Sequence, residues 1–198
     1  MRAAVDIETL YEDLDELGVD VFSCPLSKFE AMAEPEGYLG VDYSKIQSEA
    51  QEREILIHEE GHFATNTFYT YDSPFTIRQH QENIAIRHGY KKYYSLEKLL
   101  AAMEEGYTEV WDLAEHFGVS QEYVREMLAY YTGACGVDFA KELAIRHRDR
   151  ALAEDPIAPE TLEQLKGIGV SCHGPLTETA AQDILRLEAF VRQKKAKK

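Results

Sequence analysis

Apolar residues recur along most of the chain at the three- and four-residue spacing of an α-helix, and only short segments alternate as a β-strand does. The alternating segments, Val19–Ser23 and Tyr38–Tyr43, predict two short strands near the front of the chain. Between them, Phe29–Met32 predicts a short helical turn. The segments with helical spacing are 6–17, 44–67, 72–88, 95–103, 109–115, 120–131, 138–153 and 177–195. We therefore expect an α+β fold that is mainly helical.

Glycine and proline mark the expected ends of these helices. Gly18 stops the first helix, and Gly106 follows the helix that covers 95–103. Asp72 as a capping residue and Pro74 at the first helical position predict the start of the helix over 72–88. Gly89 predicts the end of that helix.

The character of the chain changes after the segment 132–136, beyond which the helical segments are amphipathic or strongly charged. At 198 residues the chain has room for one ordinary domain and a helical extension. We therefore predict a domain over residues 1–133 and a helical C-terminal appendage, of unknown role, over 134–198.

The chain is strongly acidic, with 36 Asp and Glu against 21 Lys and Arg and a formal net charge of −15. Such a surface repels nucleic acids and anionic lipids, because both carry dense negative charge. The basic segment 192–198 is an exception, and we expect it to be a solvated terminus. The sequence predicts neither nucleic-acid binding nor membrane binding.

The ends and the cysteines point to the cytoplasm. The first residues run directly into acidic Asp6 and do not resemble a signal peptide, and no apolar run reaches the roughly 18 residues of a membrane span. The three cysteines are far apart and include no Cys-x-x-Cys pair, so neither a disulfide framework nor a thiolate zinc site is expected. These cysteines are Cys24, Cys135 and Cys172.

The segment His58–His62 is a His-Glu-x-x-His motif within an expected helix. Residues i and i+4 of a helix lie on one face, so His58 and His62 can bind the same Zn²⁺ ion. Glu59 then lies beside the metal, where a carboxylate can act as a general base toward water. Gly61 is unfavourable inside a helix, which suggests that something approaches the backbone closely there. The alternative is a surface helix that carries two histidines by chance.

A catalytic zinc site needs a third protein ligand. Thr65 and Phe68 stand where the metzincin pattern requires Gly and His, so that subclass is excluded. Glu82 lies on the next predicted helix, and an antiparallel return of that helix would bring it back to the metal. Other candidates for the third ligand are His80, His88 and Glu97.

Two further groups of residues are weaker candidates. A tyrosine near the motif could stabilise the oxyanion of a tetrahedral intermediate, although most of these tyrosines are expected in the core. The adjacent Cys172 and His173 could suggest a second metal site, but no partner residues lie nearby at ligand spacing. The tyrosines concerned are Tyr69, Tyr71, Tyr90, Tyr93 and Tyr94.

Residues 109–131 have the pattern of a helix-turn-helix, with Gly118 in the turn and Ser120 as the cap of the second helix. A DNA-binding unit needs cationic side chains on the second helix. Here Arg125 is the only basic residue in 104–131, against seven acidic ones. We therefore expect a packing unit or a protein-binding surface, and no direct contact with DNA.

Together these features resemble the ImmA/IrrE family of metallopeptidases, which occurs widely on bacterial mobile elements and prophages. The resemblance covers about Val19 to Tyr131 and combines four segments. No counterpart is recognised for residues 133–198, and the Ala-rich run usual after the glutamate is replaced by 84–88. The four segments are 40–42, 55–63, 78–83 and 111–120.

The resemblance implies a zincin-like zinc endopeptidase that cleaves a helix-turn-helix repressor of a mobile element or stress regulon. It assigns the metal to His58, His62 and Glu82, and the role of general base to Glu59. We expect the substrate strand to lie along the edge of the small sheet. The alternative is a non-catalytic metal-binding module that regulates a transcription factor by binding it.

Overall fold

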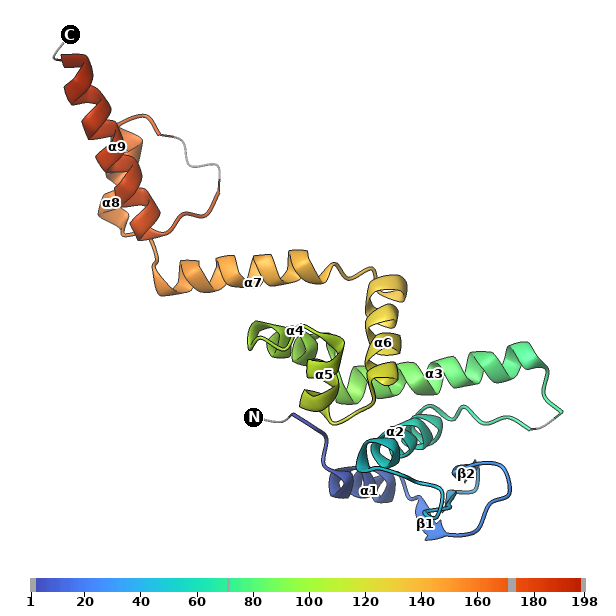
Figure 1. The fold of residues 1–198 in the computed structure, drawn as a ribbon. Helices are drawn as coiled ribbons and strands as arrows, with labels where there is room; N and C mark the ends of the chain where they lie inside the picture. The colour runs from blue at the N-terminus through green and yellow to red at the C-terminus, as the bar shows by residue number, and fades with distance from the viewer. Residues whose placement is uncertain (1–2, 71, 171–173, 197–198) are drawn as a thin grey trace. The chain divides into compact units, whose positions relative to one another are not determined.

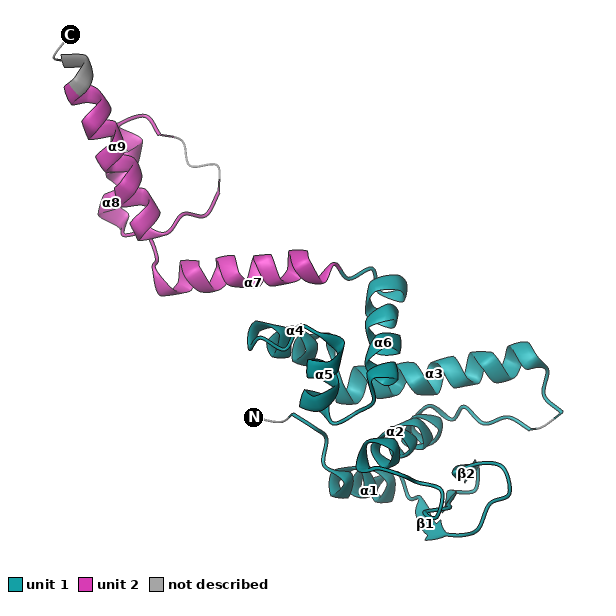
Figure 2. Ribbon diagram, in the orientation of Figure 1, with its two compact units in different colours: residues 1–137 teal, residues 138–198 magenta. Residues whose placement is uncertain are grey.

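The computed structural model of the protein describes residues 3–70, 72–170 and 174–196, without the side chains of 194–196. It is mainly helical with one small sheet, which confirms the expected α+β class (Figure 1). Two compact units divide the chain, Met1–Val137 and Asp138–Lys198 (Figure 2). The first unit contains α1 (Ile7–Glu16), β1 (Asp20–Ser23), β2 (Ala31–Glu34), β3 (Tyr38–Val41), α2 (Glu49–Thr65), α3 (Phe75–Tyr93), α4 (Leu96–Glu104), α5 (Val110–Phe117), α6 (Gln121–Ala129) and a π-helical turn (Tyr130–Ala134).

The sheet has the strand order β1-β3-β2, with β1 parallel and β2 antiparallel to β3. The prediction of a helical turn at Phe29–Met32 was wrong, because Ala31 and Met32 belong to β2. A tight turn at Gly37, whose φ of 91° favours glycine, returns the chain so that β2 pairs with β3. Since β2 pairs with β3 alone, it forms one edge of the sheet, next to α2.

Two glycines let α2 and α3 pack closely in antiparallel directions. A methyl group added at Gly61 would lie 2.5 Å from the carbonyl oxygen of Ala85, and one at Gly89 would lie 2.6 Å from Ile57. Both distances are too short for a side chain, so only glycine fits at either position. The prediction that Gly89 ends the helix was wrong, because this close packing outweighs the roughly 1 kcal/mol that a mid-helix glycine costs.

The starts of α2 and α3 differ from expectation. The first begins at Glu49 and not near residue 44, since the Ser48 side chain accepts a hydrogen bond from Gln51 N–H over 3.2 Å and caps it. The second begins after Pro74, which occupies the capping position itself. The expected side-chain cap from Asp72 is absent there, because no side chain caps this helix.

The helix-turn-helix-like segment is formed by α5 and α6, as predicted, and its turn packs on α2. Gly118 has a φ of 65° in the turn, and Ser120 caps α6 by accepting from Tyr123 N–H over 3.1 Å. The buried Arg53 of α2 donates to the Gly118 carbonyl, and Glu54 accepts from Ser120 N–H. The turn is therefore held by charged groups of α2.

The second unit consists of α7 (Phe139–Glu154), α8 (Pro159–Gly167) and α9 (Glu178–Ala196). No residue of α7 is buried, whereas α8 and α9 pack on each other around Leu165 and Ala181. The short helix α8, which Pro159 begins, lies between the predicted helical segments 138–153 and 177–195 and was not predicted.

Some predicted features lie outside the described residues. These are Tyr71, Cys172, His173 and the last two residues of the basic tail. In the described part of the chain, no helix combines the length and the apolar character that crossing a lipid bilayer requires.

Candidate metal centre

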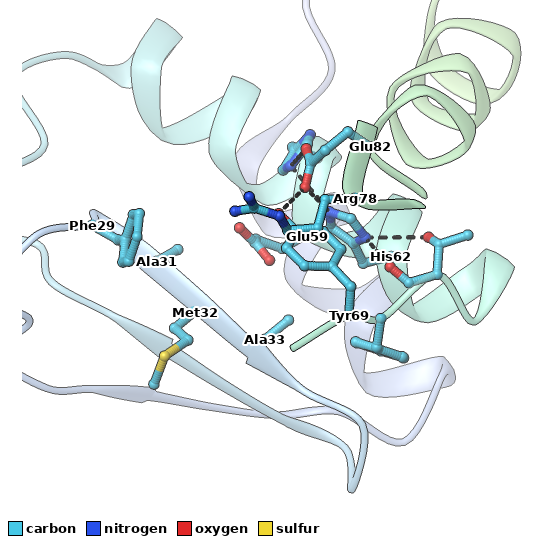
Figure 3. A pocket seen from close by; sticks show the side chains of 12 residues that line it. Phe29, Ala31, Met32, Ala33, Glu59, His62, Tyr69, Arg78 and Glu82 are labelled. Carbon is cyan, nitrogen blue, oxygen red and sulfur yellow. Dashed lines mark hydrogen bonds and ion pairs between the residues drawn. The ribbon is translucent and has the colours of Figure 1, made fainter. Parts of the chain in front are cut away.

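The helix α2 presents His58 and His62 to the same cavity, one turn apart (Figure 3). Their rings meet edge to face, with centroids 4.7 Å apart and planes at 86°. Their Nε2 atoms approach to 3.2 Å. The geometry expected for i and i+4 residues of one helix therefore brings two imidazole nitrogens to one point.

Glu82 of α3 completes the cluster. One of its oxygens lies 3.1 Å from His58 Nε2, and the other lies 3.5 Å from His62 Nε2. The antiparallel packing of α3 against α2, made possible by Gly61, brings the carboxylate there. Within the described residues, His58, His62 and Glu82 are the group of side chains that could hold a metal ion.

The potential ligand atoms of these three residues lie within 4.8 Å of one another, close enough to hold one metal ion. Ligand bonds of about 2.1 Å at tetrahedral angles place the ligand atoms about 3.4 Å from one another. Here the two Nε2 atoms lie 3.2 Å apart, and Glu82 approaches them with two different oxygens, one 3.1 Å from His58 and the other 3.5 Å from His62. Two imidazoles and one carboxylate also form a ligand set that leaves a fourth position for water, as catalytic zinc sites do.

The orientation of His62 is set by the chain just after α2. Asn66 adopts a left-handed conformation with a φ of 52°, and this turns the backbone back toward the helix. The carbonyl oxygen of the buried Thr67 consequently lies 2.7 Å from His62 Nδ1. Because a carbonyl only accepts, Nδ1 carries the proton, and the neutral ring keeps the Nε2 lone pair for a metal.

Glu59 lines the same cavity but lies outside the cluster of ligand atoms. Burial raises the pKa of its carboxyl group, and positive charge on His58 and His62 acts against this rise. Glu59 therefore borders the cluster of potential metal ligands without belonging to it.

The charges of Glu82 and His62 depend on each other. Burial works to raise the pKa of Glu82, but hydrogen bonds from His58, His62 and Tyr69 outweigh it and hold this pKa far below its usual range. Burial works to lower the pKa of His62, and here the hydrogen bond to Glu82 and the charge of Glu59 prevail and raise it.

Among the described tyrosines considered from the sequence, Tyr69 is the one that lines the cavity. Its hydroxyl donates to Glu82, and burial together with this bond raises the pKa of Tyr69 to about 12. The other described tyrosines lie in the core, as the sequence analysis expected of most of them. They are Tyr90, Tyr93 and Tyr94.

The rival third ligands do not join the cluster. His80 is exposed on α3, and the Nε2 atom of His88 lies 3.3 Å from Glu60 on the other side of α2. Glu97 belongs to the first turn of α4. None of them appears with His58 and His62 in the group of potential metal ligands.

The cavity has a volume of about 560 Å³, within the range of small-ligand and peptide sites. One wall is formed by the edge strand β2 and by Phe29, and Arg78 of α3 lies near the carboxylates (Figure 3). Four residues that line the cavity were not predicted from the sequence to belong to the site: Phe29, Met32, Thr67 and Arg78. The spacing of Arg78, one helical turn before Glu82, is the signal that could have identified it.

No protein-family model, curated protein or solved structure matches this chain. The resemblance to the ImmA/IrrE peptidases therefore stays a prediction from sequence motifs. The convergence of His58, His62 and Glu82 is a separate observation, because it comes from the coordinates.

Proposed function

We propose that the protein is a zinc-dependent endopeptidase, with His58, His62 and Glu82 as the metal ligands and Glu59 as the general base. The observation that carries this proposal is the convergence of His58, His62 and Glu82, whose potential ligand atoms lie within 4.8 Å of one another, beside the additional carboxylate of Glu59. A metal site without a catalytic role needs no such extra carboxylate in an accessible cavity.

A zinc ion bound there supplies a Lewis acid that polarises a carbonyl group and acidifies water. Glu59 accepts the proton of the attacking water and transfers it to the amine that leaves. His62 keeps its orientation through the Thr67 carbonyl, so the ligand set does not reorganise during the reaction. Tyr69, whose hydroxyl bonds Glu82, lies where a donor could reach the developing oxyanion.

The edge strand β2 supports a peptide as the substrate. It pairs with β3 on one side only, and Ala31, Met32 and Ala33 line the cavity that contains the ligand cluster. An extended peptide can add to such an edge through backbone hydrogen bonds. The small side chains of Ala31 and Ala33 leave room for a neighbouring backbone.

The proposed substrate is a protein partner, a helix-turn-helix repressor of a mobile element or stress regulon. This part of the proposal rests on the resemblance to the ImmA/IrrE family. The acidic surface of the chain agrees with action on the repressor protein and not on its DNA, because like charges repel.

Glu59→Gln tests the proposal, because it removes the base and leaves the three ligands. Zinc-loaded wild type and variant are incubated with a mixture of unfolded proteins of known sequence, and new termini are identified by mass spectrometry. We expect new termini with the wild type and at least about 100-fold fewer with the variant, as for loss of a general base. Wild type that binds zinc but cuts nothing in this mixture, nor a co-encoded repressor, would refute peptidase activity.

The alternative is a metal-binding module that binds a transcription factor without cleaving it. It predicts that Glu59→Gln leaves all functions intact, since no proton transfer is then involved. Repression measured in cells with wild type and variant distinguishes the two: equal derepression supports the binding module, and derepression by wild type alone supports the peptidase.

A further inference from the structure

One charged side chain in the cavity has no role in the proposed reaction. Arg78 lies on α3, one turn before Glu82, and its side chain lines the same cavity as Glu59 and Glu82 (Figure 3). Its Nε atom is enclosed by protein yet has no hydrogen-bond partner. No hydrogen bond or ion pair joins Arg78 to another residue in the part of the chain that the structure describes.

Two other cations of the same unit, the buried Arg53 and the exposed Lys92, have partners within the chain. Arg53 donates Nε to the Val5 carbonyl over 2.6 Å and a terminal nitrogen to Glu49 over 2.5 Å. Lys92 lies 3.0 Å from both Asp13 and Glu60. An enclosed N–H group of a guanidinium without a partner is costly, because it loses its hydration and gains no hydrogen bond in exchange. Arg78 is therefore suited to a partner that is not part of this chain.

The chemistry of the guanidinium selects that partner. Glu59 and Glu82 are committed to proton transfer and to the metal, so neither is available to neutralise Arg78 during the reaction. A backbone carbonyl accepts from one or two of the five N–H groups and brings no charge. A carboxylate accepts two parallel hydrogen bonds from the planar fork and also neutralises it.

We infer that Arg78 is a specificity-determining residue that binds a carboxylate of the substrate next to the cleaved bond. The inference rests on the proposed peptidase function and names its substrate class: peptides with an acidic group on the α3 side of the cavity. The carboxylate belongs either to an Asp or Glu side chain or to the C-terminus of the substrate. The apolar wall of Phe29 and Met32 then takes an uncharged part of the same peptide.

Peptide binding tests the inference without requiring cleavage. The proteins are zinc-loaded Glu59→Gln chains that carry in addition Arg78→Gln, Arg87→Gln or no further change. Arg87 is a matched control, since it is an exposed arginine of the same helix whose charge lies over the Tyr130 ring, away from the cavity. The probes are hexapeptide libraries with Glu or Gln at one fixed position and an amidated end, and a non-acidic library with a free or an amidated end.

With Arg78 present, we expect Glu at one position, or the free C-terminus, to improve binding about tenfold or more over its neutral counterpart. The Arg78→Gln change should abolish this preference, whereas Arg87→Gln should keep it. If Arg78→Gln also loses zinc, Arg78→Lys retains the charge without the fork and should show a reduced preference. A preference in the Glu and Gln libraries assigns the carboxylate to a side chain, and a preference for the free end assigns it to the C-terminus.

Three results would overturn the inference: equal binding of Glu and Gln peptides with no effect of the free end, a preference that persists without Arg78, or no peptide binding at all. The proposed function is tested separately with the same libraries and zinc-loaded wild type. Absence of cleavage, together with an Arg78-dependent preference in binding, would refute the peptidase and retain the carboxylate site.

Discussion

The two faces of α2 carry buried charge in different ways. On the anchor face, formed by Arg53 and Glu60, each charge has its counter-charge within the chain: Glu49 for Arg53, and Lys92 for Glu60. The metal face is formed by His58, Glu59 and His62. There the Nε2 atoms of the two histidines converge with the Glu82 oxygens, and each of these atoms can bind a proton or a metal ion.

This difference separates a structural role from a functional one. Charges that are compensated internally hold α1, α3 and the turn at Gly118 against α2. Histidine nitrogens and carboxylate oxygens that converge repel one another unless a metal ion or protons join them. The anchor face should therefore determine stability, and the metal face should determine zinc affinity.

The largest expected effect is on the metal face. His58→Ala removes one of three protein ligands, and zinc affinity should fall on the order of 100-fold, given that roughly 10–16 kcal/mol of binding is shared by four ligands. The His58 side chain is 30% exposed, so the stability of the metal-free protein should change by less than about 1 kcal/mol. Competition with a chromophoric chelator and urea unfolding measure the two quantities. Exposed His80→Ala is the control, and equal zinc affinity in both variants would contradict the assignment.

On the anchor face, Glu60→Gln should lower the free energy of unfolding by roughly 2–4 kcal/mol. The carboxylate is 1% exposed and lies 3.0 Å from Lys92, so the change leaves a cation with less compensation. The zinc affinity of the folded protein should stay within about threefold of wild type, because Glu60 points away from the metal. Glu49→Gln, at a position whose side chain is 74% exposed, should cost less than about 1 kcal/mol. A large loss of zinc affinity in Glu60→Gln would contradict the assignment of stability to the anchor face and of zinc affinity to the metal face.

Gly61→Ala should affect both properties, because this residue lies at the contact between α2 and α3. The added methyl group would lie 2.5 Å from the Ala85 carbonyl oxygen, so α3 must move and carry Glu82 away from the histidines. We expect a loss of about 1–3 kcal/mol in stability and a clear fall in zinc affinity. Gly133→Ala, where nothing lies within 4 Å, is the control. Unchanged zinc affinity would show that the close helix packing is not what positions Glu82.

The smallest effect concerns Asp13, at the edge of the anchor face. Burial works to raise its pKa, but the Tyr93 hydroxyl and the Lys92 ammonium group outweigh this and lower it. A carboxyl whose pKa is lower in the folded state stabilises the protein above its unfolded pKa, and this contribution disappears as the pH falls through the folded pKa. Asp13→Asn should therefore cost about 1 kcal/mol near neutral pH and nothing in strong acid. Unfolding curves at several pH values test this, and a difference independent of pH would contradict it.

Local patterns in the sequence were sufficient for most helices and for the pair His58 and His62. Helical periodicity fixes which residues share a face, so the i and i+4 relation needs no tertiary information. Ser120 and Gly118 likewise predicted the turn between α5 and α6, because capping and left-handed turns are local.

Features that depend on contacts distant in sequence were not predictable in the same way. The strand β2 exists because β3 pairs with it, and its own composition is not typical of a strand. Gly89 remains helical because Ile57 packs on it, which the local pattern cannot show. The enclosure of Arg78 and the contact of Thr67 with His62 likewise depend on how α2 and α3 meet.

Zinc content is the most direct test of the proposed metal centre. Wild type, Glu82→Ala and Glu97→Ala are loaded with zinc, freed of excess metal and measured by elemental analysis; Glu97 is a control because it is a carboxylate on α4, outside the cluster. If Glu82 is the third ligand, wild type and Glu97→Ala should contain about one zinc per chain, and Glu82→Ala should contain far less. No zinc in wild type, or full retention in Glu82→Ala, would contradict a metal centre formed by His58, His62 and Glu82.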